Sequence, residues 1–570
     1  MRRLPFALLG VLFAGSAFFF FACRSTQQPA PASAVSAAWL ADATADSHLA
    51  FVHVAQPEGT YAMPRSMGSG AALLDFDGDG RLDVYLLQHG GPDSGVTNRL
   101  FHQEPDKTFR DVSKGSGLDV AGYGTGVAAG DLTNDGRVDL VVTEYGRIRL
   151  FVNNGDGTFT DATSAAGVDN PVWGMSISLC DFDRDGWLDI AIANYVDYKP
   201  ATLCDDRAGK HDFCGPWSFA TLSSRLFRSR GVKSGSAQPA AFEDVTARSG
   251  IGGRRGAGLG IVCADFTGDR WPDLLIANDG AANHLWVNQH DGTFADEAAL
   301  RGIAYDGMGR PEANMGIAVG DADGDGLDDV YVTHLTSELH RAWMQGPQGF
   351  FQDRTAAIGL SRPKWRSTGF GVAFGDFDQD GALDLVQANG RVRRDDALAD
   401  GNPDHFWNVY GERNQLFAND GHGRFRDIST DNAAFAGQPS VSRGLAIGDI
   451  DGDGALDVLV SRIASSVQLF RNVAPRRGHW LKIRAVDPAL GGRDVYGAEV
   501  RVRAGSRSWT RTINPGYSYL SSNAPDAHFG LGSVERVDNV SVVWPDGQEE
   551  MFPGSGVDKT LLLKRSRQNR

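Results

Sequence analysis

Short hydrophobic segments recur in pairs along the chain, and a polar loop of constant length separates the two members of each pair. The segments GAALL, GVAAG, GIAVG, GVAFG and GLAIG lead into these loops, and VYLL, LVVT, IAIA, VYVT and VLVS lead out of them. Short apolar runs rich in β-branched residues and bounded by Gly and Asp are typical of buried strands. Each loop is therefore predicted to join two short strands.

A second hairpin follows each pair of strands. RLFHQEPDKTFRDVS, RLFVNNGDGTFTDAT, HLWVNQHDGTFADEA and QLFANDGHGRFRDIS each contain a hydrophobic strand, a polar turn and a Phe-x-Asp strand. Four antiparallel strands repeated seven times predict an all-β fold, a seven-bladed β-propeller. The Phe-x-Asp strand is missing from the last repeat, and the segment 40–44 near the N-terminus matches it. We expect that segment to supply the outer strand of the last blade and so protect an exposed edge.

The polar loops share the pattern Asp-x-Asp-x-Asp-Gly-x-x-Asp, which suits a calcium ion. Carboxylates at positions 1, 3, 5 and 9, with the main-chain carbonyl of position 7, can form the all-oxygen shell that calcium prefers. The residues at positions 1, 3, 5, 7 and 9 are, in chain order, Asp75, Asp77, Asp79, Arg81 and Asp83; Asp131, Thr133, Asp135, Arg137 and Asp139; Asp181, Asp183, Asp185, Trp187 and Asp189; Asp265, Thr267, Asp269, Trp271 and Asp273; Asp321, Asp323, Asp325, Leu327 and Asp329; Asp376, Asp378, Asp380, Ala382 and Asp384; and Asp449, Asp451, Asp453, Ala455 and Asp457.

Two other structures could contain such a loop, an EF-hand and a solvated turn without an ion. An EF-hand needs a Glu at position 12, where these loops carry Leu, Val, Ile or Gln, and it needs helices on both sides. A solvated turn without an ion would explain one copy but does not explain seven in the same strand context. Thr133 and Thr267 replace Asp at position 3, and Arg270 replaces Gly at position 6 of the fourth loop. We expect the second and fourth loops to bind calcium more weakly, and the fourth is the one expected to be empty.

Composition agrees with a metal-binding role. The chain has a formal net charge of -16, with 71 acidic residues, many of them in the loops. Clustered carboxylates repel one another unless cations neutralise them. Up to seven structural calcium ions would remove most of the net charge. No basic patch points to nucleic acid.

The N-terminus and the cysteines predict export. Residues 1–22 have the features of a signal peptide, and the following Cys23 resembles a bacterial lipobox cysteine that would carry a lipid anchor. Cleavage after 32–34 and retention of the apolar run as a membrane anchor are the alternatives. We expect a tether at 23–37, the propeller at 38–474, a small β-domain of sandwich type at 475–565 and a tail at 566–570. A disulfide is expected between Cys204 and Cys214, whereas Cys180 and Cys263 are expected to be buried free thiols.

Two long insertions, 195–224 and 390–413, fall on the face opposite the Asp loops, together with other irregular connections. Aromatic and Arg side chains at the mouth of a propeller are plausible binding residues, although packing of the loops explains many of them equally well. The candidate ligand residues are Trp173, Arg255, Arg310, Glu312, Asn314, Trp365, Arg366 and Arg443. In the C-terminal domain, Trp480, Tyr517, Tyr519 and Trp544 are expected to be core and corner residues.

Several longer stretches carry a family resemblance. They are PEANMGIAVGDADGDGLDDVYVTHLTSE, STGFGVAFGDFDQDGALDLVQANGRV, FCGP, GAEVRVRAG, GYSYLSSNAPDAHFGLG and VVWPDG. They resemble the FG-GAP/VCBS repeats of integrin α heads and, more closely, the cartilage acidic protein family, whose members end in an ASPIC/UnbV domain. The resemblance covers nearly the whole chain after the signal peptide. It implies a ligand face opposite the calcium loops, as in integrin-type propellers.

Three functions follow as hypotheses. The first is a calcium-dependent binding or adhesion protein of the bacterial envelope, anchored by lipid at the outer membrane or cell surface, that recognises a glycan or an extracellular protein. The second is a polysaccharide lyase or hydrolase with its active site between the two domains, although no nucleophile elbow, zinc signature or phosphate loop is found. The third is a scaffold for assembling other envelope proteins. Contact with a membrane is expected only through the N-terminal anchor.

Overall fold

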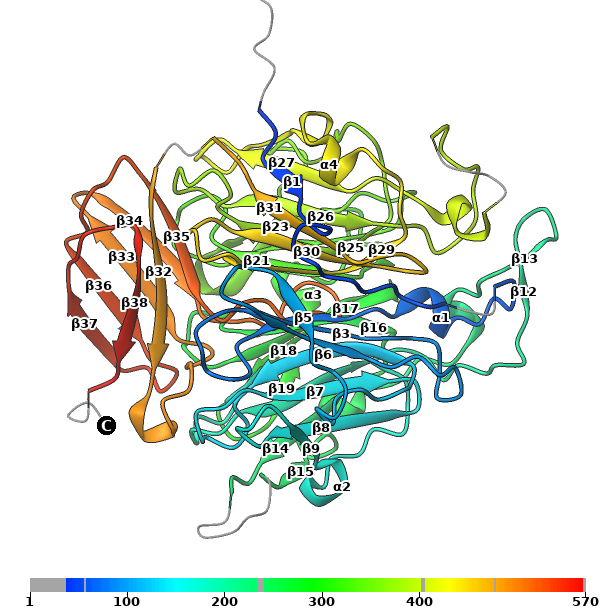
Figure 1. The fold of residues 1–570 in the computed structure, drawn as a ribbon, viewed down its shortest axis with the longest axis horizontal. Helices are drawn as coiled ribbons and strands as arrows, with labels where there is room; N and C mark the ends of the chain where they lie inside the picture. Colours follow the sequence, from blue (N-terminus) through cyan, green and yellow to red (C-terminus); the bar gives the residue numbers. More distant parts are fainter. Residues whose placement is uncertain (1–36, 56–57, 233–239, 401–404, 476–477, 567–570) are drawn as a thin grey trace, which may run out of the picture. The chain divides into compact units, whose positions relative to one another are not determined.

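A computed structural model describes residues 37–55, 58–232, 240–400, 405–475 and 478–566 of the chain. The signal peptide, Cys23 and most of the tether expected from the sequence lie outside the described residues. Ala37–Arg570 is one compact unit. Its architecture is all-β, built from antiparallel sheets with short helical turns between them (Figure 1).

Seven repeat sheets carry the Asp loops, and each contains four strands that pair in chain order, except that the fourth strand of the last sheet comes from the N-terminal end of the described residues. We number them in chain order as sheets 1 to 7, and each Asp loop takes the number of its sheet. Sheet 1 contains β2 (Ala71–Leu74), β3 (Asp83–Leu86), β4 (Arg99–Gln103) and β5 (Phe109–Asp111); sheet 2 contains β6 (Gly124–Gly130), β7 (Asp139–Glu144), β8 (Arg147–Asn153) and β9 (Phe159–Asp161); sheet 3 contains β10 (Gly174–Cys180), β11 (Asp189–Asn194), β14 (Arg225–Ser229) and β15 (Phe242–Asp244); sheet 4 contains β16 (Gly258–Ala264), β17 (Asp273–Ala281), β18 (His284–Asn288) and β19 (Phe294–Asp296).

The remaining three sheets follow the same plan. Sheet 5 contains β21 (Ile317–Gly320), β22 (Asp329–Val332), β23 (Arg341–Gly346) and β24 (Phe350–Asp353); sheet 6 contains β25 (Gly369–Gly375), β26 (Asp384–Asn389), β27 (Gln415–Asn419) and β28 (Phe425–Asp427); sheet 7 contains β29 (Ser442–Gly448), β30 (Asp457–Arg462), β31 (Gln468–Asn472) and β1 (Leu40–Asp42). Strand β1 comes from the N-terminal end of the described chain, and its Leu40 lies opposite Asn472 of β31.

Successive sheets contact one another through their first strands. Strands β2, β6, β10, β16, β21, β25 and β29 are in contact in that order, and β29 also contacts β2. The first two strands of every sheet are buried along almost their whole length, which explains why they read as continuous apolar runs. Apolar side chains of neighbouring sheets share common cores, as Leu74 and Val127 do between sheets 1 and 2.

A buried amide side chain at the end of the third strand links most sheets to the preceding one. Asn153 in sheet 2, for example, donates from Nδ2 to the carbonyl oxygen of Phe76 in Asp loop 1 at 2.7 Å. Gln103 in sheet 1 donates to Ile450 in Asp loop 7 at 2.7 Å, which connects the two ends of the series. The other donor and acceptor pairs are Asn288 to Phe182, Gln345 to Phe266, Asn419 to Ala322 and Asn472 to Phe377.

The C-terminal residues form two further sheets. One contains β35 (Ala527–Gly532), β32 (His479–Val486) and β38 (Lys559–Lys564), and the other contains β34 (Arg507–Thr512), β33 (Glu499–Ala504), β36 (Asn539–Val543) and β37 (Glu549–Pro553). Strands β32 and β38 are parallel. Strand β37 is difficult to recognise in the sequence, because its residues EEMFP are exposed or half-buried and show little apolar alternation.

Short elements complete the fold. The helices are single turns, α1 (Pro64–Met67), α2 (Thr163–Ala166), α3 (Ala298–Arg301) and α4 (Ala433–Ala436). The first insertion holds a small hairpin of β12 (Cys204–Asp205) and β13 (His211–Asp212), and β20 (Glu312–Ala313) pairs with the end of β17. In the part of the chain that is described, no helix is both long enough and apolar enough to cross a membrane.

Candidate metal centres and the opposite face

Backbone hydrogen bonds organise the carboxylates of each Asp loop. In Asp loop 3, Asp181 at position 1 accepts the backbone N–H groups of Asp185 and Gly186 at 3.0 and 2.8 Å. Asp189 at position 9 accepts the N–H of Phe182 at 3.0 Å and that of Ser229, on the third strand, at 2.7 Å. The position 9 carboxylate is therefore held by both its own loop and the neighbouring hairpin.

Two positions of the loop need a left-handed backbone. Position 6 has a positive φ in all seven loops, and the Arg270 that replaces Gly there adopts φ 72°. Position 4 also has a positive φ in all seven loops, occupied by Gly or by a residue such as Asn134 (53°) or Arg184 (58°). Position 6 can be recognised in the sequence from its Gly, whereas position 4 cannot, because its residue type varies.

The carboxylates of a loop converge on a small volume. In Asp loops 1, 3, 5 and 6, three carboxylates offer oxygen atoms that all lie within 4.8 Å of one another. Burial raises the pKa of Asp83 to about 8 and that of Asp329 to about 8, and it raises the pKa of Asp189 well above its usual value. Without a further positive charge, Asp83 and Asp329 would hold protons at neutral pH.

The donor set fits a hard divalent cation. All the side-chain donors are oxygens, and Asp183 Oδ1 in Asp loop 3 is buried with no hydrogen-bond donor among the described residues. Such a group costs free energy unless a cation or water satisfies it. When bound, calcium would be held by positions 1, 3, 5 and 9 and the carbonyl of position 7, and it would stabilise the turn between the first two strands.

The two loops expected to be weak differ in their local contacts. Thr133 and Thr267 turn their hydroxyl groups toward the position 1 carboxylates of their own loops, at 3.3 and 3.5 Å. In Asp loop 4, the Trp271 ring stacks on the His290 ring with 4.6 Å between the ring centres. The Arg184 guanidinium lies 4.2 Å from the centre of the Trp271 ring. At position 3 these two loops therefore offer a hydroxyl in place of the carboxylate of the other loops.

Side chains of the C-terminal sheets reach the face formed by the Asp loops. Lys482 Nζ lies 2.8 Å from Asp449 of Asp loop 7. Arg493 donates to the carbonyl oxygen of Gly186 at 3.0 Å, and Tyr496 donates from its hydroxyl to that of Ala129 at 3.0 Å. The nearby Asp131 and Asp181 carboxylates lie close enough to Arg493 to interact with its charge. The C-terminal sheets thus cover part of the Asp-loop face.

The connection 514–524, between β34 and β35, makes hydrogen bonds with the first strand of every repeat sheet. Ser522 exchanges backbone hydrogen bonds with β2, its N–H donating to Ala71 and its carbonyl accepting from Leu73, both at 3.0 Å. Ser518 exchanges a similar pair with Ile317 of β21, at 2.7 and 3.1 Å. The remaining donor and acceptor pairs are Val127 to Leu520, Leu520 to Ser176, Asn514 to Cys263, Val372 to Ser518 and Ala524 to Ile447.

This arrangement corrects the expectation for Tyr517 and Tyr519. Trp544 is buried among C-terminal residues as expected. Tyr519, however, is fully buried among repeat-sheet residues, and its hydroxyl donates to the carbonyl of Met67 in α1 at 3.0 Å. Tyr517 also packs against the cores of the repeat sheets. These tyrosines belong to an extended connection rather than to a domain core.

The structure also corrects the assignment of two cysteines. Cys180 of β10 and Cys263 of β16 form a disulfide, and Cys204 forms the predicted one with Cys214. Cys180 and Cys263 are 83 residues apart in sequence. The sequence does not indicate this pairing, because the two cysteines meet only when the first strands of adjacent sheets lie side by side.

The eight candidate ligand residues divide into two groups. Trp173 and Arg443 are fully buried, and Glu312 and Asn314 are buried as well. The Arg443 guanidinium lies 4.0 Å from the centre of the Phe370 ring and donates to the carbonyls of Ser66 and Gly390. Arg255, Arg310 and Arg366 are exposed, and Trp365 is half-buried. Only this second group can contact a ligand without rearrangement.

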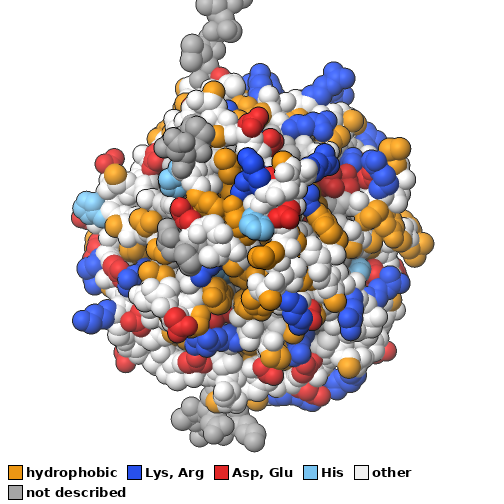
Figure 2. Space-filling view, turned by 90° about the vertical axis from the view of Figure 1, so that its right-hand side faces the viewer, with side chains coloured by type: hydrophobic (Ala, Val, Ile, Leu, Met, Phe, Trp, Pro, Cys, Tyr) orange, Lys and Arg blue, Asp and Glu red, His pale blue; other side chains and the backbone are white. Residues whose placement is uncertain are grey.

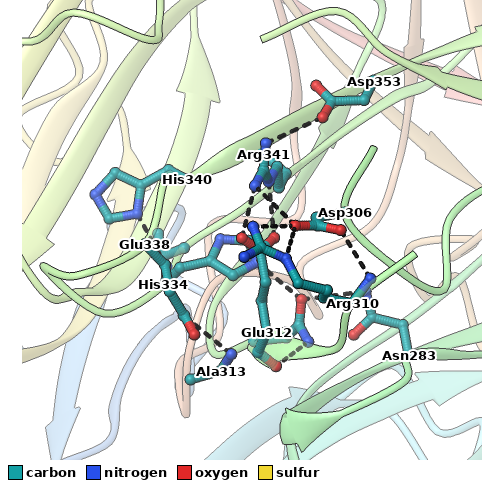
Figure 3. Close-up of polar contacts among 12 residues, drawn as sticks. Asn283, Asp306, Arg310, Glu312, Ala313, His334, Glu338, His340, Arg341 and Asp353 are labelled. Carbon is teal, nitrogen blue, oxygen red and sulfur yellow. Dashed lines mark hydrogen bonds and ion pairs between the residues drawn. The ribbon is translucent and has the colours of Figure 1, made fainter. Parts of the chain in front are cut away.

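Glu312 belongs to an ion-pair network between sheets 4 and 5 (Figure 3). Its carboxylate accepts two hydrogen bonds from Arg341, at 2.6 and 2.7 Å, and Arg341 also pairs with Asp353 at 3.1 Å. Asp306 is close to Arg341 and accepts hydrogen bonds from the backbone and the side chain of Arg310. Burial by itself would raise the pKa of Asp306, but the hydrogen bonds lower it to about 2. Every carboxylate here has a partner, which indicates a structural role.

The two insertions pack on each other on the face shown in Figure 2, where hydrophobic and charged side chains are interspersed. The Phe213 and Trp407 rings stack 5.8 Å apart, and the Tyr410 hydroxyl donates to Asp212 at 2.7 Å. At the edge of this contact, Trp217 remains 67% exposed and lies under the Arg393 guanidinium, 4.3 Å away. Most of the aromatic side chains in the insertions therefore pack the loops together, and Trp217 is the exception.

Family models match most of the repeats and the C-terminus. The FG-GAP-like repeat model matches residues 75–142, 131–192, 265–332 and 396–460, and the ASPIC and UnbV model matches residues 490–570. Cartilage acidic protein 1 of Mus musculus is 27% identical over 508 residues, covering 86% of this chain and 63% of the relative, and the Homo sapiens protein is 27% identical with 62% of its length covered. The chain therefore spans less than two thirds of these relatives.

Among solved structures, an Agrocybe aegerita lectin that recognises non-reducing terminal N-acetylglucosamine matches with a TM-score of 0.38 and 15% identity, over 71% of this chain and 94% of that one. The repeated Asp loops, the seven repeat sheets and the C-terminal β-sheets agree with the two family models. The chain belongs to the family of FG-GAP-repeat proteins that end in an ASPIC and UnbV domain, to which cartilage acidic protein 1 is homologous.

Proposed function

We propose that this protein is an extracellular, calcium-dependent binding protein whose repeat sheets form a closed, seven-bladed propeller. The cyclic order of contacts among the first strands, and the Gln103 bond to Ile450 between the first and last sheets, support the ring. The observation that carries the calcium assignment is the repeated convergence of buried carboxylates in the Asp loops. Millimolar extracellular calcium would suffice for sites of the affinity found in extracellular modules, about 10⁻⁴ to 10⁻³ M.

In this proposal, calcium has a structural role and the ligand contacts the opposite face. The Asp loops are covered in part by the C-terminal sheets, whereas Trp217, Arg255, Arg310 and Arg366 are exposed elsewhere. An exposed aromatic ring beside a guanidinium group, as Trp217 and Arg393 provide, suits a glycan or a protein surface. The N-terminal segment would hold the protein at the bacterial envelope through Cys23.

Chelation tests the calcium part. Removing calcium with EGTA should lower the melting temperature, because the buried carboxylates then repel one another, and re-addition should restore it. Magnesium at the same concentration serves as the control cation. An unchanged melting temperature on chelation, with no calcium found in the untreated protein by elemental analysis, would refute a structural role for calcium.

A glycan array and a pull-down from envelope extracts, each performed with and without EGTA, test the binding part. Substituting Trp217 by Ala should reduce binding at least tenfold while leaving the melting temperature within a few degrees, because the side chain is mostly exposed. Phe219→Ala, on the same insertion but half-buried, is the comparison for nonspecific loop damage.

A second function is favoured by a cavity of about 600 Å³ between Asp loops 1, 2 and 7 and the C-terminal sheets. Asp526 and Lys482 line it, and burial raises the Asp526 pKa to about 6. A carboxyl group with such a pKa could act as a general acid on a polysaccharide. Release of oligosaccharides from a polysaccharide panel, abolished in Asp526→Asn, would favour this enzymatic function over simple binding.

A further inference from the structure

One position on the third strand of each repeat sheet lies beside the Asp loop of that sheet. It immediately precedes the residue whose backbone N–H donates to the position 9 carboxylate. The residue at this position differs from sheet to sheet, although the Asp loops beside it share one motif. In chain order the residues are His102, Val152, Arg228, Val287, Met344, Ala418 and Arg471.

In sheet 3 this position places a guanidinium group within the carboxylate cluster. Arg228 Nη2 lies 3.0 Å from Asp185 Oδ2, and Nε is ion-paired with Asp183 Oδ2. Both acidic residues are calcium ligands in the proposed scheme, at positions 3 and 5. Arg228 is itself largely covered, with 28% of its side chain exposed.

Sheet 7 repeats the arrangement. Arg471 Nη1 lies 3.4 Å from Asp451 Oδ2 and 3.1 Å from Asp457 Oδ2, at positions 3 and 9 of Asp loop 7. Lys482 of the C-terminal sheets pairs with Asp449 at position 1 of the same loop. Asp loop 7 therefore holds two positive charges of the protein.

Asp loop 5 differs in this respect. It has Asp at positions 1, 3, 5 and 9, and Met344 stands at the position of Arg228. Within the described parts of the chain, none of its four carboxylates has a cationic nitrogen within 4.0 Å, and the Arg511 charge acts on Asp321 from farther away. Its carboxylate oxygens converge as in the other loops.

An arginine in the cluster must oppose calcium. Its guanidinium group stays protonated at all accessible pH values and has only donors, so it cannot join the calcium coordination shell. It also occupies the carboxylate oxygens that calcium needs at 2.3–2.6 Å. Calcium entering such a loop must share the carboxylates with the arginine, whose positive charge repels it, so binding is weaker than in a loop without the arginine.

We infer that Arg228 and Arg471 act as resident cations in Asp loops 3 and 7, so that these loops bind calcium more weakly than Asp loop 5. The inference rests on the proposed calcium function and deepens it. The seven sites then differ in calcium affinity because of third-strand residues that lie outside the loop motif. Calcium would bind to Asp loop 5 before it binds to Asp loops 3 and 7, which would fill only at higher calcium concentrations.

A reciprocal exchange of residues tests this inference in the full chain. Arg228→Met gives sheet 3 the residue that sheet 5 has, and Met344→Arg does the reverse. Arg225→Met, on the same strand but paired with Asp244 outside the loop, is the matched control. Circular dichroism and melting temperature would establish that each variant folds.

Terbium ions substitute for calcium and luminesce when an excited tryptophan is close. Trp187 occupies position 7 of Asp loop 3 and Trp271 occupies position 7 of Asp loop 4, so the part of the emission that Trp187→Phe removes reports on Asp loop 3. Arg228→Met should lower the terbium concentration at half-maximum of this Trp187-dependent emission at least fivefold. Equilibrium dialysis with calcium should show that Met344→Arg loses one of the tightest sites, while Arg225→Met behaves as the unmodified protein.

The outcomes separate the two hypotheses. If the unmodified protein binds neither calcium nor terbium, the proposed function fails and this inference fails with it. If it binds calcium but Arg228→Met and Met344→Arg leave the affinities unchanged, the inference alone is overturned. If Arg228→Met does not fold, the Met344→Arg result decides, because loss of a tight site supports the inference and its retention overturns it.

Discussion

Two buried histidines have pKa values that the sequence pattern does not indicate. His53 and His89 lie near each other with ring centres 6.4 Å apart, and both are almost completely buried. Burial lowers the pKa of His53 to about 3 and that of His89 to about 4, with a smaller contribution from nearby positive groups. Both side chains are therefore neutral in the folded protein across the physiological range.

These histidines predict an acid sensitivity. Between pH 6.5 and pH 4.5 they take up protons in the unfolded chain but not in the folded one, so the free energy of unfolding falls as the pH falls. Each should cost about 2 kcal/mol at pH 4.5 relative to pH 7. Urea denaturation at both pH values measures this loss, which His53→Gln should reduce. Exposed His422→Gln is the control, and an equal loss in both variants would show that the buried ring is not responsible.

At the scale of single elements, the buried amide at the end of the third strand links two neighbouring Asp loops, which the sequence does not indicate. Asn153 donates to Phe76 of the preceding Asp loop and to Val138 of its own, at 2.7 and 3.1 Å, and it accepts the N–H of Gly155. The next residue, Asn154, is exposed and bonds only within its own turn. The two adjacent asparagines look alike in sequence, but they lie on opposite sides of the strand.

Substituting each asparagine separately tests this difference. Asn153→Ala should lower the free energy of unfolding by about 2–4 kcal/mol, because two buried carbonyls lose their donor. Asn154→Ala should change it by less than about 0.5 kcal/mol. Chemical denaturation of both variants gives the comparison. Equal effects would mean that the bond to Phe76 does not stabilise the junction of sheets 1 and 2.

The two disulfides should also differ in their contributions. The Cys180–Cys263 disulfide joins residues separated by 83 positions in the sequence, and the Cys204–Cys214 disulfide joins residues separated by 10. In the chain-entropy description the longer loop stabilises more, by about 2 kcal/mol. Melting temperatures of the two double Cys→Ser variants measure the difference, and the first pair should give the larger decrease. A larger decrease for the second pair would contradict this expectation.

At the scale of the whole molecule, the repeat sheets and the C-terminal sheets are joined by more than a linker. The 514–524 connection bonds to the first strand of every repeat sheet, and C-terminal cations reach the Asp loops. Residues of sheets 2 and 3 share one hydrophobic core with the C-terminal sheets. The C-terminal sheets are thus part of the structure that holds the repeat sheets together.

This integration predicts a single cooperative unfolding transition. Calorimetry should show one peak, and near-ultraviolet and far-ultraviolet circular dichroism should change at the same temperature. Ser522→Pro, which removes the N–H that bonds to Ala71, should lower that temperature, whereas Ser506→Pro, in the exposed turn of the C-terminal hairpin, should lower it less. Two separate transitions in the unmodified protein would show that the C-terminal sheets unfold independently.

The sequence by itself determined the features that depend on local spacing. Apolar runs predicted the strands that flank each Asp loop, the Asp pattern predicted a carboxylate cluster, and the short separation of Cys204 and Cys214 indicated their disulfide. Each of these involves residues that are close along the chain. Period-2 alternation and turn residues are sufficient to recognise them.

Only the tertiary structure decided the features that join distant segments. The Cys180–Cys263 disulfide, the burial of Trp173 and Arg443, the position of Tyr519 and the arginines beside Asp loops 3 and 7 all depend on which strands lie side by side. A side chain at a given position in the sequence can face solvent, a core or a neighbouring sheet. That choice is made by packing, because the hydrophobic free energy of burial depends on the whole surface removed from water and not on the order of residues.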